Sequence, residues 1–491
     1  MKLTELIKST GASAPNIDPA LLERDVDSFV IDSREIGAGD VFFALSQPDY
    51  QRNGFNGDFD DATKFASSAL QKGAVACVLR RDGFEKHRAE LSEMENRLIF
   101  VDDAIKALQD LAMRVYSDWN KPVIAITGSA GKTTGKELTA HVLAASGRKV
   151  LRNTKNYNNG IGHPLTVLEL AGDNSYDIAV LEMGMSTPMH EIERLCRITP
   201  PDVAVVLNVL PVHVEHLGSI DNVAKAKAEI IEGMKEGGTA VLNADDSRVL
   251  EMRGLSKGDV ITFGIEAAAG VTASDIRFEA FGRTSFRLKT PQGEADISYA
   301  LNGRHNVLNA LAAAAAAHAT GMAAGEIAAA LETAAAPGQR GEILRFADGF
   351  TVINDSYNSN PTALLSMVET MVGGAAKTGR KIVVAGEMLE LGEDARRIHR
   401  ETGQAIAEAG VDLLIGVRGL AADLVDGAKA AGLENVIFAN DSDEGGKILQ
   451  NEIKPRDIVL IKGSRGVRTE KVLEKLIEKF ELEKNTSGIA V

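Results

Sequence analysis

Residues 123–127 form an apolar run that leads directly into a loop with Gly128 and Gly131. Residues 135–143, which follow the loop, have the spacing of an amphipathic helix. A buried strand that turns through glycines into a helix leaves backbone N–H groups around a concavity that suits phosphate oxygens. We therefore predict a parallel α/β sheet with a phosphate-binding loop made of Gly128, Ser129, Ala130, Gly131, Lys132, Thr133 and Thr134.

The chain is long enough for three domains. It has 491 residues, and a typical domain has about 150. Residues 117–122 are mostly polar and end in Pro122, whereas Pro337 and Gly338 interrupt the strand and helix pattern further on. We therefore expect domains at residues 1–119, 120–336 and 337–491.

Short apolar strands alternate with helices through all three predicted domains. Strands are expected at residues 28–31, 40–45, 74–79, 178–181, 203–207, 239–242, 351–353, 381–385, 413–417, 436–438 and 458–462. A helix is expected at 62–72, and two closely packed alanine-rich helices within 308–336, separated near 320–321. This alternation predicts an α/β fold: a small N-terminal α/β domain, a central parallel sheet with the phosphate loop, and a doubly wound, Rossmann-like C-terminal domain.

Charge and cysteine content narrow the class of protein. The formal net charge of -15 argues against a nucleic-acid surface. No signal peptide and no unbroken apolar run of about 20 residues is found, so we expect a cytoplasmic protein without membrane insertion. Cys77 and Cys196 are far apart in apolar or helical contexts, which indicates buried free thiols.

Polar groups follow several strands of the predicted central sheet. Glu182 ends one strand, His213 follows another, and Lys227 lies in a later helix; residues 153–162 are rich in asparagine and glycine. The carboxyl ends of parallel strands meet at one crevice, so these groups could join the phosphate loop. Each of these features also has a structural explanation. Glu182 could be an ion-pair partner, His213 a buried histidine and Lys227 a solvated lysine. Residues 153–162 could form a surface turn.

Seven motifs in order resemble the Mur ligase family, ATP-dependent amide-forming enzymes of peptidoglycan assembly. They lie at residues 127–134, 158–162, 182–184, 213–217, 226–227, 303–306 and 337–340. Residues 354–361, Asn-Asp-Ser-Tyr-Asn-Ser-Asn-Pro, are similar to the family member that adds D-alanyl-D-alanine to UDP-N-acetylmuramoyl tripeptide. The alternatives are the ligase that adds the third amino acid, a folylpolyglutamate synthetase, and a nucleotide-dependent switch without ligase chemistry.

The resemblance implies a nucleotide site that spans two domains. Residues 128–134 would hold the ATP phosphates, with Lys132 on the terminal phosphates. Two magnesium ions are implied, with the ligands Thr133, Glu182, His213 and a carbamate formed from carbon dioxide on Lys227. Asn306 would lie near adenine, and Arg340 and Asp355 would close on the nucleotide. The residues implied in catalysis are Lys132, His213, Lys227 and Arg340.

The resemblance also implies where the other substrates bind. Ser33 and Arg34 match the uridine-binding pattern, although residues 47–54 depart from the family's usual sequence. Gln339 stands between Gly338 and Arg340, where the family commonly has Pro-Gly-Arg. The implied partners are small molecules, and we expect a monomer. The remaining substrate-binding candidates are Asn158, Asn159, Asn358 and Asn360.

Overall fold

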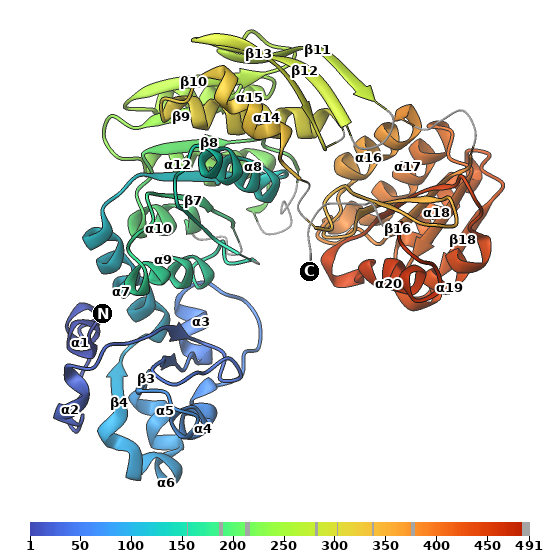
Figure 1. The fold of residues 1–491 in the computed structure, drawn as a ribbon. Helices are drawn as coiled ribbons and strands as arrows, with labels where there is room; N and C mark the ends of the chain where they lie inside the picture. The colour runs from blue at the N-terminus through green and yellow to red at the C-terminus, as the bar shows by residue number, and fades with distance from the viewer. Residues whose placement is uncertain are drawn as a thin grey trace.

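Three β-sheets lie in three bodies of the molecule (Figure 1). The computed structural model describes residues 1–154, 156–185, 190–211, 217–279, 283–301, 303–335, 338–374 and 379–483. The predicted α/β fold is confirmed, and each predicted domain contains one sheet. The boundary expected between Ala336 and Pro337 lies outside the described residues. Among the described residues, no helix has the length and apolar character needed to cross a membrane.

The N-terminal body is a parallel sheet covered by short helices. Its strands pair in the order β1 (Phe29–Val30), β2 (Val41–Phe43), β3 (Ala76–Arg80) and β4 (Leu98–Val101). The helical elements are α1 (Leu3–Thr10), α2 (Pro19–Leu22), α3 (Gln47–Arg52), η1 (Ala62–Phe65), α4 (Ala66–Gln71), α5 (Arg81–Lys86), α6 (Arg88–Leu91) and η2 (Ser92–Arg97). The helix expected at 62–72 is thus a 3-10 turn followed by a short α-helix.

Helix α7 (Ala104–Trp119) joins the N-terminal body to the central one. Its buried residues are apolar and recur every three or four positions, as expected for an amphipathic helix. One core cluster contains Leu3 and Val41 from the N-terminal body and Val167 and Ile198 from the central body. The two bodies therefore share a hydrophobic core that extends across α7.

The central body is built on a nine-stranded sheet. Its order is β13-β12-β11-β10-β9-β8-β5-β7-β6, and the pairs from β6 to β11 are parallel. The parallel strands are β5 (Val123–Thr127), β6 (Val150–Arg152), β7 (Ile178–Glu182), β8 (Val203–Val206), β9 (Thr239–Asn243) and β10 (Asp259–Gly264). Because β7 and β8 flank β5, their carboxyl ends lie beside the phosphate loop.

The sequence interpretation missed an antiparallel extension of this sheet. It consists of β11 (Val271–Glu279), β12 (Arg283–Thr290) and β13 (Gly293–Tyr299). The strand β12 alternates exposed and buried residues with period two, a pattern typical of a half-buried strand. The extension passes above the central helices toward the C-terminal body (Figure 1), and β11 contacts α16 (Pro361–Gly374).

Helices cover both faces of the central sheet. They are α8 (Lys132–Ala145), α9 (Gly162–Gly172), α10 (Glu191–Ile198), α12 (Ile220–Glu232), α13 (Ser247–Glu251), η3 (Met252–Leu255), α14 (Arg304–Ala319) and α15 (Ala324–Glu332). The expected alanine-rich helix pair is confirmed as α14 and α15. Residues 312–317 of α14 are buried alanines, and their small side chains let α14 pack closely on α8.

The C-terminal body is a doubly wound sheet of six strands. Their order is β14 (Glu342–Arg345), β15 (Thr351–Asp355), β19 (Ile458–Lys462), β16 (Lys381–Gly386), β17 (Leu413–Val417) and β18 (Val436–Ala439). Only β14 in this sheet is antiparallel. The further helical elements are η4 (Gly392–Asp394), α17 (Ala395–Glu408), α18 (Ala421–Ala430), α19 (Ser442–Glu452), η5 (Arg465–Val467) and α20 (Glu470–Lys479).

Helices α17 and α18 cross with their backbones close together at two glycines, and a mutation can test whether this close approach stabilises the fold. A Cβ on Gly403 would lie 1.9 Å from Leu424 O, and one on Gly427 would lie 2.0 Å from Arg400 O. We expect Gly403→Ala to lower the free energy of unfolding by about 1–3 kcal/mol, because the helices must separate. The measurement is the melting temperature of the full chain by calorimetry.

Gly325→Ala is the matched control. A Cβ on Gly325, in the helix α15, would meet nothing within 4 Å. Alanine favours helix more than glycine does, so this variant should melt at the same or a higher temperature. Equal losses in both variants would contradict the role of the α17–α18 crossing.

Candidate functional site

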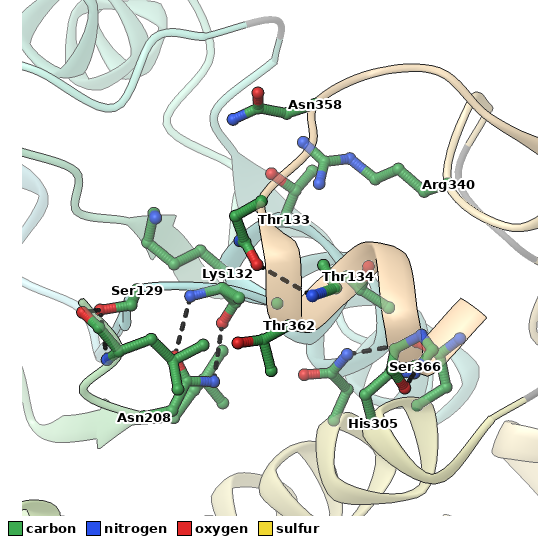
Figure 2. A pocket seen from close by; sticks show the side chains of 18 of the residues that line it. Ser129, Lys132, Thr133, Thr134, Asn208, His305, Arg340, Asn358, Thr362 and Ser366 are labelled. Carbon is green, nitrogen blue, oxygen red and sulfur yellow. Dashed lines mark hydrogen bonds between the residues drawn. The ribbon is translucent and has the colours of Figure 1, made fainter. Parts of the chain in front are cut away.

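A cavity of about 370 Å³ lies between the carboxyl ends of the central strands and the segment that follows β15. Figure 2 shows side chains from both bodies pointing into it. Among the residues that line it are these predicted site residues: Ser129, Ala130, Gly131, Lys132, Thr133, Thr134, Asn158, Glu182, Asn306, Arg340, Asp355, Asn358 and Asn360. The structure therefore brings most of the predicted site into one place.

The phosphate loop turns into α8 through a left-handed glycine. Gly131 has φ 82°, and a Cβ there would lie 2.4 Å from Asn309 Oδ1. The helix α8 has no hydrogen bond from a side-chain cap at Gly131. Backbone N–H groups in the first turn of such a helix, together with the helix dipole, attract anions. The loop has the geometry expected of a phosphate site.

Asn208 holds this loop in place, a role that the sequence interpretation did not assign. Its Oδ1 accepts from Ala130 N at 2.8 Å, and its Nδ2 donates to Ala130 O at 3.1 Å. The carbonyl of Asn208 also accepts from Ser129 N at 3.0 Å, and Ser129 Oγ accepts from Leu210 N at 2.9 Å. The available signal was a polar residue two positions after β8, but the sequence did not show which backbone groups it would bond.

Thr133 and Glu182 are in direct contact. The Thr133 hydroxyl donates to Glu182 Oε2 at 2.8 Å, and Asn158 Nδ2 donates to Oε1 at 2.7 Å. Asn153 fixes the backbone of Glu182, accepting from its N–H at 3.0 Å and donating to its carbonyl at 2.8 Å. The hydroxyl and the carboxylate therefore sit together at the mouth of the phosphate loop.

These oxygen atoms are of the kind that Mg²⁺ prefers. His213, the other unmodified side chain predicted to bind magnesium, lies outside the described residues. Within the described ranges no cluster of three or more His, Cys, Asp and Glu side chains could hold a metal ion. Thr133 and Glu182 fit a magnesium ion that takes its remaining ligands from phosphate and water, as Mg²⁺ commonly does.

Two lysines of the central body have lowered pKa values. Loss of water around Lys132 lowers the pKa of its ammonium; Glu182 opposes this shift, and the charge of Arg340 adds to it. Lys132 Nζ donates to Gly128 O at 2.9 Å. Lys227 on α12 is 2% exposed, and burial holds its pKa well below the ordinary value, with a further lowering from Lys132.

The C-terminal wall of the cavity contains an ion pair. Asp355, at the end of β15, accepts from Lys462 Nζ at 2.5 Å, and the same ammonium donates to Asn358 O at 2.9 Å. His305 Nδ1 lies 3.1 Å from Ser366 Oγ, so this pair spans the central and C-terminal bodies. Loss of water lowers the pKa of His305 to about 4, which keeps the ring neutral at pH 7.

Some predicted site residues lie away from the cavity. Asn159 Oδ1 accepts from the N–H groups of Ile161 and Gly162 at 3.1 and 2.9 Å, where α9 begins. Arg34 is exposed on the loop after β1 and pairs with Asp32 at 2.6 Å. The substrate-binding roles of these residues stay predictions. Of the predicted residues that the structure describes, five are not among those lining the cavity: Ser33, Arg34, Gly128, Asn159 and Lys227.

A smaller cavity of about 150 Å³ shares part of this wall. Ser129 and residues 358–360 line both cavities, and Leu389, Ser464 and Arg465 line the smaller one. Ser359 Oγ is buried and has no hydrogen-bond partner among the described residues. A buried hydroxyl without a partner is costly, so this group is available to a ligand.

Comparison with known proteins identifies the family. The Mur ligase middle domain matches residues 126–317, and the Mur ligase, glutamate ligase domain matches residues 339–465. The chain is 31% identical over 481 residues to the UDP-N-acetylmuramoyl-tripeptide--D-alanyl-D-alanine ligase of Bacillus subtilis, which covers 97% of each chain. It is 32% identical over 459 residues to the enzyme of that name from Escherichia coli, covering 92% of this chain and 94% of the relative.

Solved structures agree with these sequence relatives. A crystal structure of MurF from Acinetobacter baumannii is 27% identical, with a TM-score of 0.83, and covers 97% of this chain and 99% of its own. MurF ligase from Thermotoga maritima, solved in complex with ADP, is 27% identical with a TM-score of 0.77 and covers 92% of this chain and 98% of its own. The chain belongs to the Mur ligase family.

Proposed function

We propose that the protein is an ATP-dependent ligase that adds D-alanyl-D-alanine to UDP-N-acetylmuramoyl tripeptide in peptidoglycan precursor synthesis. The observation that carries this proposal is the cavity that joins the phosphate loop to residues 355–360, the run similar to the D-alanyl-D-alanine-adding member of the family. The names of the relatives in Bacillus subtilis and Escherichia coli support it. The ADP complex of the Thermotoga maritima relative supports a nucleotide in this cavity.

The proposed reaction has two steps. The terminal carboxylate of the tripeptide attacks the γ-phosphorus of ATP, which forms an acyl phosphate and releases ADP. The free amine of D-alanyl-D-alanine then attacks the acyl carbon, and phosphate leaves as the amide bond forms. Lys132 and the amides of the phosphate loop stabilise the negative charge on the transferred phosphoryl group. Asn306 and Asp355 would hold the nucleoside end.

Thr133 and Glu182 are the described residues that would hold magnesium, and His213 stays a predicted ligand. When bound, Mg²⁺ offsets the phosphate charge and lets the carboxylate approach. Lys227 would supply a further oxygen ligand as a carbamate. Carbamylation requires a neutral amine, and the burial that lowers the pKa of Lys227 favours this form.

We assign the amine substrate to the smaller cavity. Arg465, which pairs with Glu470 at 3.1 Å, would turn to a terminal carboxylate, and the hydroxyl of Ser359 would bond a peptide group. The side chains of Leu389 and Leu391 suit small methyl groups. Asn358 and Asn360 lie between the two cavities, where the amine must meet the acyl phosphate.

The three bodies would divide the substrates between them. We assign the uridine end to the N-terminal body, with Ser33 and Arg34 as contacts, and the sugar-peptide side to Asn158 and Asn159. We also propose that the enzyme acts as a monomer in the cytoplasm. Cys77 and Cys196 are buried free thiols, which fits a reducing compartment.

Release of ADP tests the proposed function. The full chain is incubated with ATP, Mg²⁺ and UDP-N-acetylmuramoyl tripeptide, and in turn with D-alanyl-D-alanine, L-alanyl-L-alanine or single amino acids. We expect ADP release that depends on D-alanyl-D-alanine and falls at least about 100-fold in Lys132→Ala, because the transferred charge loses its cation. With the UDP-N-acetylmuramoyl dipeptide in place of the tripeptide, ADP release that depends on a single amino acid would favour the ligase that adds the third residue. Release that needs no amine would favour a nucleotide switch.

Lys227→Ala tests the carbamate. We expect kcat to fall at least about 100-fold and to recover in part when acetate or another short carboxylate is added, because these anions replace the missing oxygen ligand. Lys225→Ala removes an exposed lysine from the same helix and is the control. Full activity of Lys227→Ala, or no recovery with any carboxylate, would contradict the carbamate.

A further inference from the structure

Two guanidinium groups lie close to the ring of Tyr357, which lines the larger cavity. Arg340 Cζ is 3.9 Å from the centroid of its ring, and Arg465 Cζ is 5.7 Å from the same centroid. Both distances are within the range in which the negative face of an aromatic ring attracts a cation. Arg340 lines the larger cavity, which contains the phosphate loop, whereas Arg465 lines the smaller cavity.

The backbone of Arg340 is held firmly, but its side chain depends on the ring. Gln339 and Gly341 on either side have φ 62° and 76°. Tyr357 N donates to Gln339 O at 3.2 Å, and Gly341 N donates to Asn354 O at 3.0 Å. In the part of the chain that the structure describes, no carboxylate pairs with the Arg340 guanidinium. The ring of Tyr357 is therefore the contact that orients this cation.

The orientation of Arg340 matters because it faces the phosphate loop. Figure 2 shows Arg340 extending from the C-terminal side toward Asn358 and Thr133. Arg340 and Lys132 line the same cavity, one from each body. Two cations that repel each other across a cavity are favourable only when an anion lies between them.

We propose that Tyr357 is a positioning residue, whose ring holds the Arg340 guanidinium over the transferred phosphate. The inference rests on the proposed function, since it assigns the anion as the phosphoryl group of ATP. The ring acts through Arg340 and needs no contact of its own with the nucleotide. Its hydroxyl has no part in this role.

A double-mutant cycle tests the proposal in the full chain. We expect Tyr357→Leu to lower kcat about tenfold, with Tyr357→Phe recovering most of that loss, because phenylalanine keeps the ring face. In the Arg340→Met background, Tyr357→Leu should cause no further loss, because the cation it positions is already gone. The KM for ATP and the melting temperature are measured alongside.

Tyr176→Leu is the matched control. Lys149 Nζ lies 4.8 Å from the Tyr176 ring centroid, away from the residues that line either cavity. This variant should keep the parent kcat and KM. Equal losses from Tyr357→Leu with and without Arg340 would overturn the proposal, as would a Tyr357→Phe variant as slow as Tyr357→Leu.

Failure of the proposed function would give a different result from failure of the positioning role of Tyr357. In that case the parent protein would release no ADP in response to D-alanyl-D-alanine, whatever Tyr357 contributes. The cycle can then be repeated on the affinity for ATP, measured by calorimetry. Coupling between Tyr357 and Arg340 in that affinity would support the positioning role, and additivity would overturn it.

Discussion

The site depends on how the phosphate loop leaves the central sheet. Strand β5 is buried between β7 and β8, so its direction is set, and the chain must turn at once to start α8. The left-handed Gly131 allows that turn, and Asn208 bonds both backbone groups of Ala130. With the loop fixed, Lys132 and Thr133 project into the cavity, and Thr133 meets Glu182 at the end of the neighbouring strand.

The three bodies are joined by two different kinds of contact. The N-terminal and central bodies share one hydrophobic core around α7. The two core clusters of the C-terminal body contain only residues from 344 onward, and polar groups such as His305 and Ser366 link it to the central body across the cavity. Polar contacts are exchanged with water at little net cost, whereas opening a hydrophobic core is expensive. Ligand-dependent movement is therefore expected at the C-terminal body, where exclusion of water would protect an acyl phosphate.

Much of the fold could be predicted from the chain because its signals are local. Apolar strands and alanine-rich helices follow from periodicity over a few residues, and buried thiols follow from their apolar surroundings. The antiparallel strands β11 to β13 were missed, although β12 alternates buried and exposed residues. The loop residues 129–134, together with Asn306, Arg340 and Asp355, were placed at one site through motifs and do line one cavity. Asn208, Tyr357 and Ser359 were not assigned, because their roles depend on partners outside their own segments.

The sequence by itself determined which groups are available: a glycine-bounded loop, a strand-end carboxylate, a lysine in a helix and an Asp-Ser-Tyr-Asn run. Only the tertiary structure decided which of them meet. It joined the ends of two sheets that are far apart in the chain into one cavity, buried Lys227 where the charge of Lys132 acts on it, and brought Arg340 and Arg465 to the ring of Tyr357. Contacts of this kind depend on the packing of whole layers, which no local pattern of residues contains.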